Sequence, residues 1–276
     1  MTTHDSATVD FTTIKARQQI AWSAGDYSII GATLVVVSEN LCETVDLHAG
    51  QRVLDVATGS GITALAAARC FCEVSAIDYV PSLLERGRER AAAERLPVTF
   101  QQADAEQLPF AEASFDVVLS TFGAMFAPNQ EQVARELLRV CRSGGKIGMA
   151  NWTPTGFVGN LFRIVGKYAP PAPGLKPPAL WGTEERVREL FADRIASLEV
   201  TTRHFCFRYR SVQHWLDVFT TYYGPIHKPF QALDATGQAT MAQDFTDLLE
   251  RYNQATDGTL VVPSEYLEVV ARRTRN

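Results

Sequence analysis

A short stretch near residue 55 combines a carboxylate with closely spaced glycines, and these residue types suit the binding of a polar ligand. Residues 52–63 read RVLDVATGSGIT, in which Asp55 lies in an apolar run and Gly59 and Gly61 follow it. Glycine lets the backbone turn tightly and leaves no Cβ between the chain and a ligand. An ionised aspartate accepts hydrogen bonds without donating any. We therefore expect a ligand at this turn.

The residues on either side of the glycines indicate how the turn is held. Val53, Leu54 and Val56 form an aliphatic run without a polar face, which is typical of a buried parallel strand. Residues 62–69, ITALAAAR, are rich in alanine and predict a helix. A strand, a glycine turn and a helix in this order bind ligands at the carboxyl ends of the strands of a doubly wound sheet.

The turn alone permits a second interpretation. Gly59, Gly61 and Ala64 match the pattern G-x-G-x-x-[GA] of dinucleotide-binding proteins. A nicotinamide-dependent oxidoreductase therefore stays possible at this point, and an isolated pair of glycines is often only a turn. The choice depends on residues further along the chain.

An acidic residue also follows the second apolar run. Residues 73–77, EVSAI, predict a second strand, and Asp78 comes directly after it. A carboxylate at the end of the second strand of such a unit can accept hydrogen bonds from the two hydroxyls of a ribose. A solvated aspartate in a turn is the alternative.

Further apolar runs extend the same alternation. Strands are predicted at residues 98–101, 115–120 and 146–150, and helices from residue 81 and over residues 130–141. The last of these helices is expected to end at the glycines 144 and 145. Strands that alternate with helices predict a parallel sheet with right-handed crossovers.

Composition and charge exclude several classes of protein. The chain has 276 residues, of which 46% are hydrophobic, so it can bury a substantial core. Its net charge of -5 argues against a protein built mainly to bind nucleic acid, because such proteins usually carry a basic excess. We find no apolar run close to the roughly 20 residues of a membrane span, and no apolar leader in residues 1–11. The predicted location is the cytoplasm.

The reactive side chains show no metal or nucleophile motif. The five cysteines form an odd set without C-x-x-C pairs, which predicts neither disulfides nor a zinc cluster. The five histidines have no spacing typical of metal ligands, so we expect no metal. The sequence also has no G-x-S-x-G serine and no P-loop lysine.

The segments outside the alternating region differ in character. Before it, helices are predicted at residues 14–21 and 32–47, and Trp22 and Tyr27 either fasten this arm to the core or form a lid. After it, a proline-rich loop over 169–178 precedes a helix over 181–191, with Thr183 as a possible N-cap. Two long strands are predicted at residues 198–209 and 259–272, and the residues between them, 211–257, are helical and rich in aromatic side chains.

Taken together, these residues resemble the class I S-adenosylmethionine-dependent methyltransferases, particularly the branch that methylates quinones and small molecules. The resemblance is strong over residues 49–151 and covers the rest in layout only. In that family, an acidic residue with spaced glycines forms the first motif, as Asp55, Ala57, Gly59 and Gly61 do here. Ala57 departs from the general pattern, which has a glycine there, although the quinone branch tolerates alanine.

The resemblance implies a role for each residue at the strand ends. Asp78 matches the acid that binds the ribose, Asp104 with Ala105 the motif at the adenine edge, and Ser120 with Thr121 the strand end that faces the methyl donor. The residues expected to contact S-adenosylmethionine are Tyr27, Asp55, Ala57, Gly59, Gly61, Asp78, Tyr79, Asp104, Ala105, Ser120 and Thr121. A dinucleotide fingerprint predicts neither Asp55 four residues before Gly59 nor Asp104 with Ala105, so the methyltransferase is favoured.

The family also implies a fold and a division of the chain. The expected fold is a Rossmann-like α/β sheet of seven strands, mostly parallel, with an antiparallel C-terminal hairpin. Residues 1–276 then form a single methyltransferase domain, with a helical lid at 1–48 and a cofactor-binding core at 49–151. Residues 152–196 and 211–258 are expected to be cap insertions over the substrate site.

The expected reaction is transfer of a methyl group to a small, largely apolar acceptor. Because the leaving group is neutral, positioning and desolvation can supply most of the rate. If a base takes part, the candidates are His204, His214, His227, Tyr222 and Tyr223. The alternatives are the nicotinamide-dependent oxidoreductase and a regulator that binds S-adenosylmethionine without catalysis.

Overall fold

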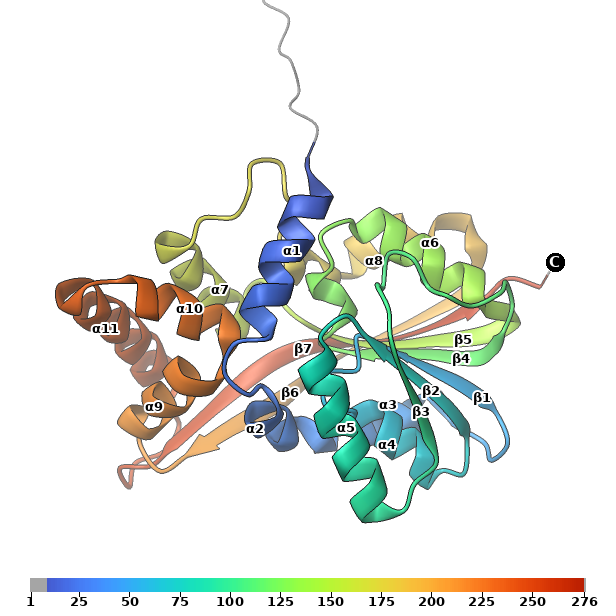
Figure 1. The fold of residues 1–276 in the computed structure, drawn as a ribbon, viewed down its shortest axis with the longest axis horizontal. Helices are drawn as coiled ribbons and strands as arrows, with labels where there is room; N and C mark the ends of the chain where they lie inside the picture. Colours follow the sequence, from blue (N-terminus) through green and yellow to red (C-terminus); the bar gives the residue numbers. More distant parts are fainter. Residues whose placement is uncertain (1–8, 276) are drawn as a thin grey trace, which may run out of the picture.

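The computed structural model describes residues 9–275, and these contain a seven-stranded sheet with helices on both faces (Figure 1). The strands are β1 Arg52–Val56, β2 Glu73–Asp78, β3 Val98–Gln102, β4 Phe115–Thr121, β5 Cys141–Trp152, β6 Ile195–Tyr209 and β7 Leu260–Arg273. Their order across the sheet is β3-β2-β1-β4-β5-β7-β6. Only β7 runs antiparallel to its neighbours, β5 and β6. The predicted sheet and its antiparallel C-terminal hairpin are confirmed.

Helices bury both faces of the sheet. Figure 1 shows α3 Val35–Val45, α4 Ile62–Arg69 and α5 Pro81–Glu94 on one face, and α6 Gln130–Val140 and α8 Glu184–Phe191 on the other. Within β1, Val53 packs in the first of these layers and Leu54 in the second, and neither is exposed to solvent. This two-sided burial explains why the strand has no polar face.

The junction between α6 and β5 differs from the prediction. The helix ends at Val140, and Cys141 is already extended, with φ -73° and ψ 131°. Gly144 has a φ of 70°, but it lies inside β5, where the pairing with β4 is irregular. Arg273 of β7 donates a hydrogen bond to the Cys141 carbonyl, which holds the start of β5 in the sheet. The predicted glycine stop was therefore wrong, because the glycines form an irregularity within a strand.

The helix predicted over residues 181–191 is divided in two. A 3-10 helix, η3 Pro178–Gly182, precedes α8, and the two meet at Thr183. The Arg186 N–H donates a hydrogen bond of 3.3 Å to Thr183 Oγ1, so the predicted N-cap is confirmed.

The N-terminal region consists of short helices that lead into the sheet. They are α1 Phe11–Trp22, α2 Ser28–Gly31 and the 3-10 helix η1 Ala32–Leu34, followed by α3. The stretch Ser28–Val45 is long and apolar enough to cross a membrane by composition alone. Its residues Leu41 and Val45 are fully buried and lie against Gly148 of β5, so the C-terminal part of the stretch packs on the sheet. Residues 1–8 of the predicted lid lie outside the described residues.

The remaining helices gather at one end of the β6–β7 hairpin (Figure 1). They are α7 Phe157–Tyr168, α9 Val212–Tyr222, α10 Gly224–Ala232 and α11 Ala235–Tyr252; the short 3-10 helices η2 Ala124–Phe126 and η4 Ala192–Arg194 lie elsewhere. Their aromatic side chains form a core, in which Trp215 stacks on Phe219 with ring centroids 4.0 Å apart. Helix α1 crosses between this group and the helices above the sheet.

Two glycines let the N-terminal arm approach the junction of α9 and α10. A Cβ at Gly224 would lie 1.8 Å from the carbonyl oxygen of Ala21 in α1. A Cβ at Gly25, which has a φ of 72°, would lie 2.6 Å from the carbonyl oxygen of Tyr222. The two segments therefore contact each other through their backbones, and no side chain larger than hydrogen fits between them.

We predict that Gly224→Ala lowers the free energy of unfolding by about 1–3 kcal/mol, because the added methyl group forces α1 and α10 apart. Chemical denaturation measures this change. Gly166→Ala in α7 is the matched control, since a Cβ there has no neighbour within 4 Å; it should stabilise the protein by up to ~1 kcal/mol through helix propensity. Equal effects of the two substitutions would contradict the close contact.

Candidate functional site

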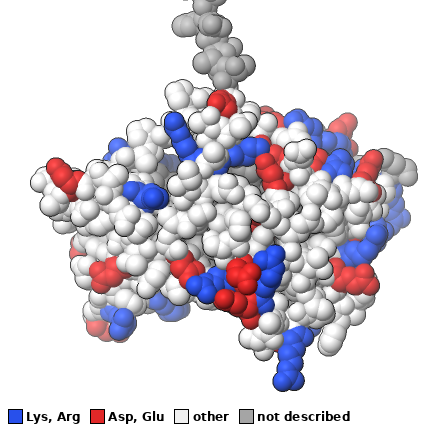
Figure 2. All heavy atoms as spheres, in the orientation of Figure 1, with Lys and Arg blue, Asp and Glu red and all other residues white. Residues whose placement is uncertain are grey.

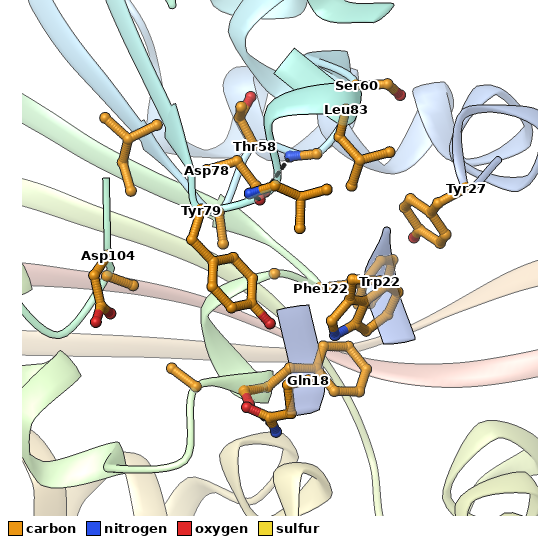
Figure 3. A pocket seen from close by; sticks show the side chains of 18 of the residues that line it. Gln18, Trp22, Tyr27, Thr58, Ser60, Asp78, Tyr79, Leu83, Asp104 and Phe122 are labelled. Carbon is orange, nitrogen blue, oxygen red and sulfur yellow. Dashed lines mark hydrogen bonds between the residues drawn. The ribbon is translucent and has the colours of Figure 1, made fainter. Parts of the chain in front are cut away.

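An open cavity lies at the carboxyl ends of the parallel strands, next to α1, and its space of about 830 Å³ includes solvent at the mouth (Figure 3). It opens next to β1 and β4. The order of the strands reverses between these two, and α/β proteins bind ligands at such a topological switch point. Its walls include Ala57, Thr58, Gly59, Ser60, Asp78, Tyr79, Leu83, Asp104, Ala105, Thr121, Phe122 and Phe126. Side chains of the N-terminal arm close it from above: Lys15, Gln18, Trp22 and Tyr27.

The glycine turn after β1 has a left-handed backbone at alternate positions. The φ angles of Ala57, Gly59 and Gly61 are 54°, 56° and 83°. This region costs a residue with a Cβ about 1–2 kcal/mol, so Ala57 is strained where the family pattern has a glycine. On the other side, a Cβ at Gly123 would lie 2.2 Å from the Ala57 carbonyl oxygen. The turn is therefore packed as closely as its backbone allows.

Asp55 holds this turn from behind the cavity wall. Its Oδ2 accepts hydrogen bonds from the Thr58 hydroxyl at 2.5 Å and from the Ala64 N–H at 3.0 Å, in the first turn of α4. The side chain is 1% exposed, and this burial raises its pKa to about 7 against the effect of the two hydrogen bonds. Asp55 and Gly61 do not line the cavity. Asp55 holds the turn by hydrogen bonds, and Gly61 adopts a left-handed backbone conformation within it.

Asp78 holds the same turn and also faces the cavity. Its Oδ2 accepts the Gly59 N–H and its Oδ1 accepts the Val80 N–H, each at 2.9 Å. Burial raises its pKa to about 6, while these backbone hydrogen bonds lower it. The carboxyl is therefore ionised at neutral pH. Each oxygen keeps a lone pair for a further donor, and this fits the two hydroxyls of a ribose.

Beyond Asp78, the cavity combines an apolar surface with one ion pair. The ring of Tyr79 lies in the cavity between Asp104 and Phe122 (Figure 3). Asp104 accepts a hydrogen bond of 2.6 Å from Lys15 Nζ, which also lies 3.0 Å from Glu106. A flat aromatic face beside a carboxylate suits a planar base that carries an amino group.

The two residues at the end of β4 have different positions. Thr121 lines the cavity, and its Oγ1 accepts a hydrogen bond of 2.9 Å from the Thr63 hydroxyl. Ser120 is buried behind the wall, where its hydroxyl donates to the Val56 carbonyl at 2.8 Å and accepts the Ala124 N–H at 2.9 Å. Ser120 thus joins β4 to β1.

A second, smaller pocket of about 400 Å³ adjoins the first. The two share Tyr27, Phe122 and Phe126. The rest of the lining is apolar or aromatic: Ile30, Leu34, Trp152, Phe157, Val158, Leu161, Phe207, Phe219 and Tyr223. Phe122 stacks on Trp152 with ring centroids 3.8 Å apart, which connects the shared wall to the rest of the lining. We name this space the aromatic pocket.

The structure brings one of the five base candidates to the pockets, and this is Tyr223. His204 is 56% exposed and lies 3.9 Å from Glu265 in a separate groove. The other candidates lie outside both pockets. His214 accepts the Arg210 N–H at 3.2 Å through Nδ1, His227 binds the Thr220 carbonyl at 2.8 Å, and Tyr222 is partly exposed.

Among the α1 residues that line the cavity, Trp22 was expected as a possible lid residue, whereas Lys15 and Gln18 were not predicted from the sequence. Lys15, Gln18 and Trp22 recur at intervals of three and four, which places them on one face of a helix. Gln18 donates a hydrogen bond of 3.0 Å to the Phe126 carbonyl, and the Trp22 ring packs edge-on against the Phe126 ring at 5.0 Å. The spacing of these polar and aromatic side chains was the signal in the sequence that could have indicated a helix face lining a site. Within residues 9–275, no group of three or more acidic, histidine or cysteine side chains could hold a metal ion.

Comparisons with known proteins agree with this geometry. Residues 54–149 match the family model of the methyltransferase domain. The chain is 38% identical to the uncharacterised protein Rv1403c of Mycobacterium tuberculosis over 257 residues, 91% of this chain and 92% of that protein. It is 34% identical to a demethylmenaquinone methyltransferase of Deinococcus radiodurans over 131 residues, 46% of this chain and 54% of that protein.

A solved structure shows the same fold. A putative methyltransferase from Bacillus halodurans superimposes with a TM-score of 0.60 at 22% identity, over 86% of this chain and 98% of that one. The chain therefore belongs to the class I S-adenosylmethionine-dependent methyltransferases. It is an enzyme that uses S-adenosylmethionine, which removes the oxidoreductase and the non-catalytic regulator from consideration.

The two buried carboxyls predict how stability depends on pH. Their folded-state pKa values of about 7 and 6 exceed the ordinary value of 3.8, so the folded protein binds more protons between pH 4 and 7. Their contribution to stability therefore rises as the pH falls through this window. We predict that wild type gains about 2 kcal/mol relative to Asp55→Asn between pH 7.5 and pH 5.

Urea unfolding of the cofactor-free protein at these two pH values measures the difference. Asp193→Asn, which alters an exposed carboxyl on η4, is the control and should leave the pH dependence of wild type unchanged. A constant difference between wild type and Asp55→Asn at both pH values would contradict the raised pKa.

Proposed function

We propose that the enzyme methylates a small, largely apolar acceptor bound in the aromatic pocket. One observation carries this proposal: the apolar pocket shares the wall formed by Tyr27, Phe122 and Phe126 with the larger cavity. An acceptor in the pocket and a cofactor in the cavity would meet at this wall. The demethylmenaquinone methyltransferase of D. radiodurans, whose name indicates an apolar acceptor, is similar to less than half of the chain and gives modest further support.

The cavity residues fit S-adenosylmethionine. The strained, close-packed turn at Gly59 leaves backbone next to the cavity, and Asp78 would accept hydrogen bonds from the ribose hydroxyls. The face of Tyr79 would contact the adenine, with Asp104 near its edge. When bound, S-adenosylmethionine supplies an electrophilic methyl group on a positively charged sulfur.

The contribution of the chain is positioning and the exclusion of water. Trp22 lines the larger cavity and packs, with ring centroids 5.0–5.6 Å apart, against Tyr27, Phe126 and Tyr223, which line the aromatic pocket. Restricting two reactants to one geometry can lower a barrier by several kcal/mol, and a dry site strengthens the local electrostatic interactions. Because the leaving group is neutral, the site needs no proton donor in addition to positioning and the exclusion of water.

The predicted cap segments are part of this proposal. Helix α7 contributes Phe157 and Leu161 to the aromatic pocket, α9 contributes Phe219, and Tyr223 follows α9 directly. We therefore propose that residues 152–196 and 211–258 act as the cap and α1 as the lid.

The surface and the thiols support a small acceptor and a reducing location. On the face shown in Figure 2, basic and acidic side chains are interspersed, and no basic track for nucleic acid is present on it. The five cysteines are free thiols, which fits the predicted cytoplasmic location.

We predict that Asp78→Ala weakens the binding of S-adenosylmethionine and S-adenosylhomocysteine by roughly 1.5–3 kcal/mol, the range for charge-assisted hydrogen bonds. Isothermal titration calorimetry measures both affinities. Asp78→Asn keeps one acceptor oxygen, so its affinity should lie between those of wild type and Asp78→Ala. Unchanged affinity in a folded Asp78→Ala variant would remove Asp78 from the site.

The acceptor class is tested by transfer of labelled methyl groups to small aromatic and isoprenoid molecules, to RNA and to protein extracts, at low and moderate salt. We expect label in the small molecules, with little effect of salt. Label confined to RNA or polypeptide would refute the proposal, and steep inhibition by salt would indicate a phosphate-binding surface instead.

A further inference from the structure

We propose that the acceptor presents an anionic nucleophile, an enolate or phenolate that has lost its proton before it binds, and that the hydroxyls of Tyr27 and Tyr223 donate hydrogen bonds to its charged oxygen. This inference rests on the proposed function, since it assigns a chemical class to the ligand of the aromatic pocket. It goes beyond that function because it says where the proton of the acceptor is removed.

The ionisable side chains around the two pockets are few. Among the described residues, those that line the larger cavity are Lys15, Tyr27, Asp78, Tyr79 and Asp104, and no histidine is among them. Asp104 is ion-paired with Lys15. Asp78 holds the glycine turn through two backbone hydrogen bonds. Neither carboxylate belongs to the lining of the aromatic pocket, so neither is placed to take a proton from an acceptor there.

The two tyrosines of the aromatic pocket are protonated. The ionisable groups in the lining of the aromatic pocket are Tyr27 and Tyr223, whose ring centroids lie 6.1 Å apart. Burial raises the pKa of both hydroxyls; Tyr209 and Asp78 raise that of Tyr27 further, and Tyr27 raises that of Tyr223. Both therefore stay protonated at neutral pH. They can donate hydrogen bonds but cannot serve as bases.

Neither hydroxyl has another partner to which it is committed. Within residues 9–275, no hydrogen bond joins the Tyr27 or Tyr223 hydroxyl to a protein group, although Tyr223 is only 7% exposed. Trp22 fixes both rings, at centroid distances of 5.4 and 5.6 Å. Two hydroxyl donors whose side chains line one apolar pocket can bind an oxygen that accepts hydrogen bonds, and they bind a charged oxygen more strongly than a neutral one.

The charge of the cofactor also favours an anionic acceptor. A protonated amine would enter a pocket that offers it no carboxylate, and it would face the positive sulfur of the cofactor. An anion would be attracted to that charge, and the attraction is strong where water is excluded. In the transfer step, an electron pair of the anion forms the bond to the methyl carbon while the carbon–sulfur pair returns to sulfur. Both charges disappear, and no proton has to be removed.

Matched coumarins test the inference by binding alone. 4-Hydroxycoumarin is a planar acidic enol, coumarin lacks the hydroxyl, and 1-naphthylmethylamine is a cation of similar size. With the enzyme saturated by S-adenosylhomocysteine, calorimetry should show 4-hydroxycoumarin binding at least about tenfold more tightly than the other two, the gain from charge-assisted hydrogen bonds. The absorption spectrum of the bound probe should be that of the anion, with its apparent pKa lowered by binding.

Variants connect the preference to the two hydroxyls. Tyr27→Phe and Tyr223→Phe should each weaken 4-hydroxycoumarin about tenfold, since each removes a single hydroxyl, and should weaken coumarin, whose carbonyl oxygen is neutral, much less. Tyr222→Phe is the matched control, because Tyr222 is adjacent in sequence and lies outside both pockets. Sinefungin carries a protonated amine in place of the methylated sulfur, and it should tighten the binding of the anion further.

The outcomes separate this inference from the proposed function. If S-adenosylhomocysteine does not bind, the proposed function fails. If S-adenosylhomocysteine binds but coumarin or the amine binds as tightly as the anion, only the anionic acceptor is refuted. Loss of 4-hydroxycoumarin binding in Tyr222→Phe to the same extent as in the other variants would also overturn it.

Discussion

Two buried carboxylates hold a strained turn, and the cofactor cavity depends on this arrangement. Asp55 binds the turn and the first turn of α4 from behind, while Asp78 binds the Gly59 N–H from the next strand. Both carboxyls have raised pKa values because they are buried, so the cofactor-free protein is destabilised by their ionisation at neutral pH. A ligand that donates hydrogen bonds to Asp78 would offset part of this cost, which couples binding to stability.

The acceptor side of the site is built differently, from aromatic packing instead of hydrogen bonds. The stacked rings of Phe122 and Trp152 connect the ends of β4 and β5, and the cap helices pack their aromatic side chains around them. Helix α1 then joins the two halves, since Lys15 binds Asp104 beside the cavity and Trp22 packs against Phe126, which lines both pockets.

Features that depend on local sequence could be predicted, and features that depend on distant packing could not. The strand ends placed Asp78 and Thr121 on the cavity because parallel strands end at the same edge of a sheet. Asp55 and Ser120 were expected beside them. Asp55 is on the same face of the sheet as Asp78 and Thr121, but it lies two residues further from the strand ends in the register. Ser120 points to the opposite face from Thr121, because side chains alternate along a strand. The three histidine candidates lie outside both pockets, because nothing in a residue's type indicates which way its helix or strand will face.

The central claim is that one cavity holds the cofactor with its reactive sulfur toward the aromatic pocket. A crystal structure of the complex with S-adenosylhomocysteine measures this directly. The account predicts the ribose hydroxyls on Asp78, the adenine against Tyr79 and the sulfur at the wall formed by Tyr27 and Phe122. A sulfur directed away from that wall, or a ribose bound elsewhere than at Asp78, would contradict it.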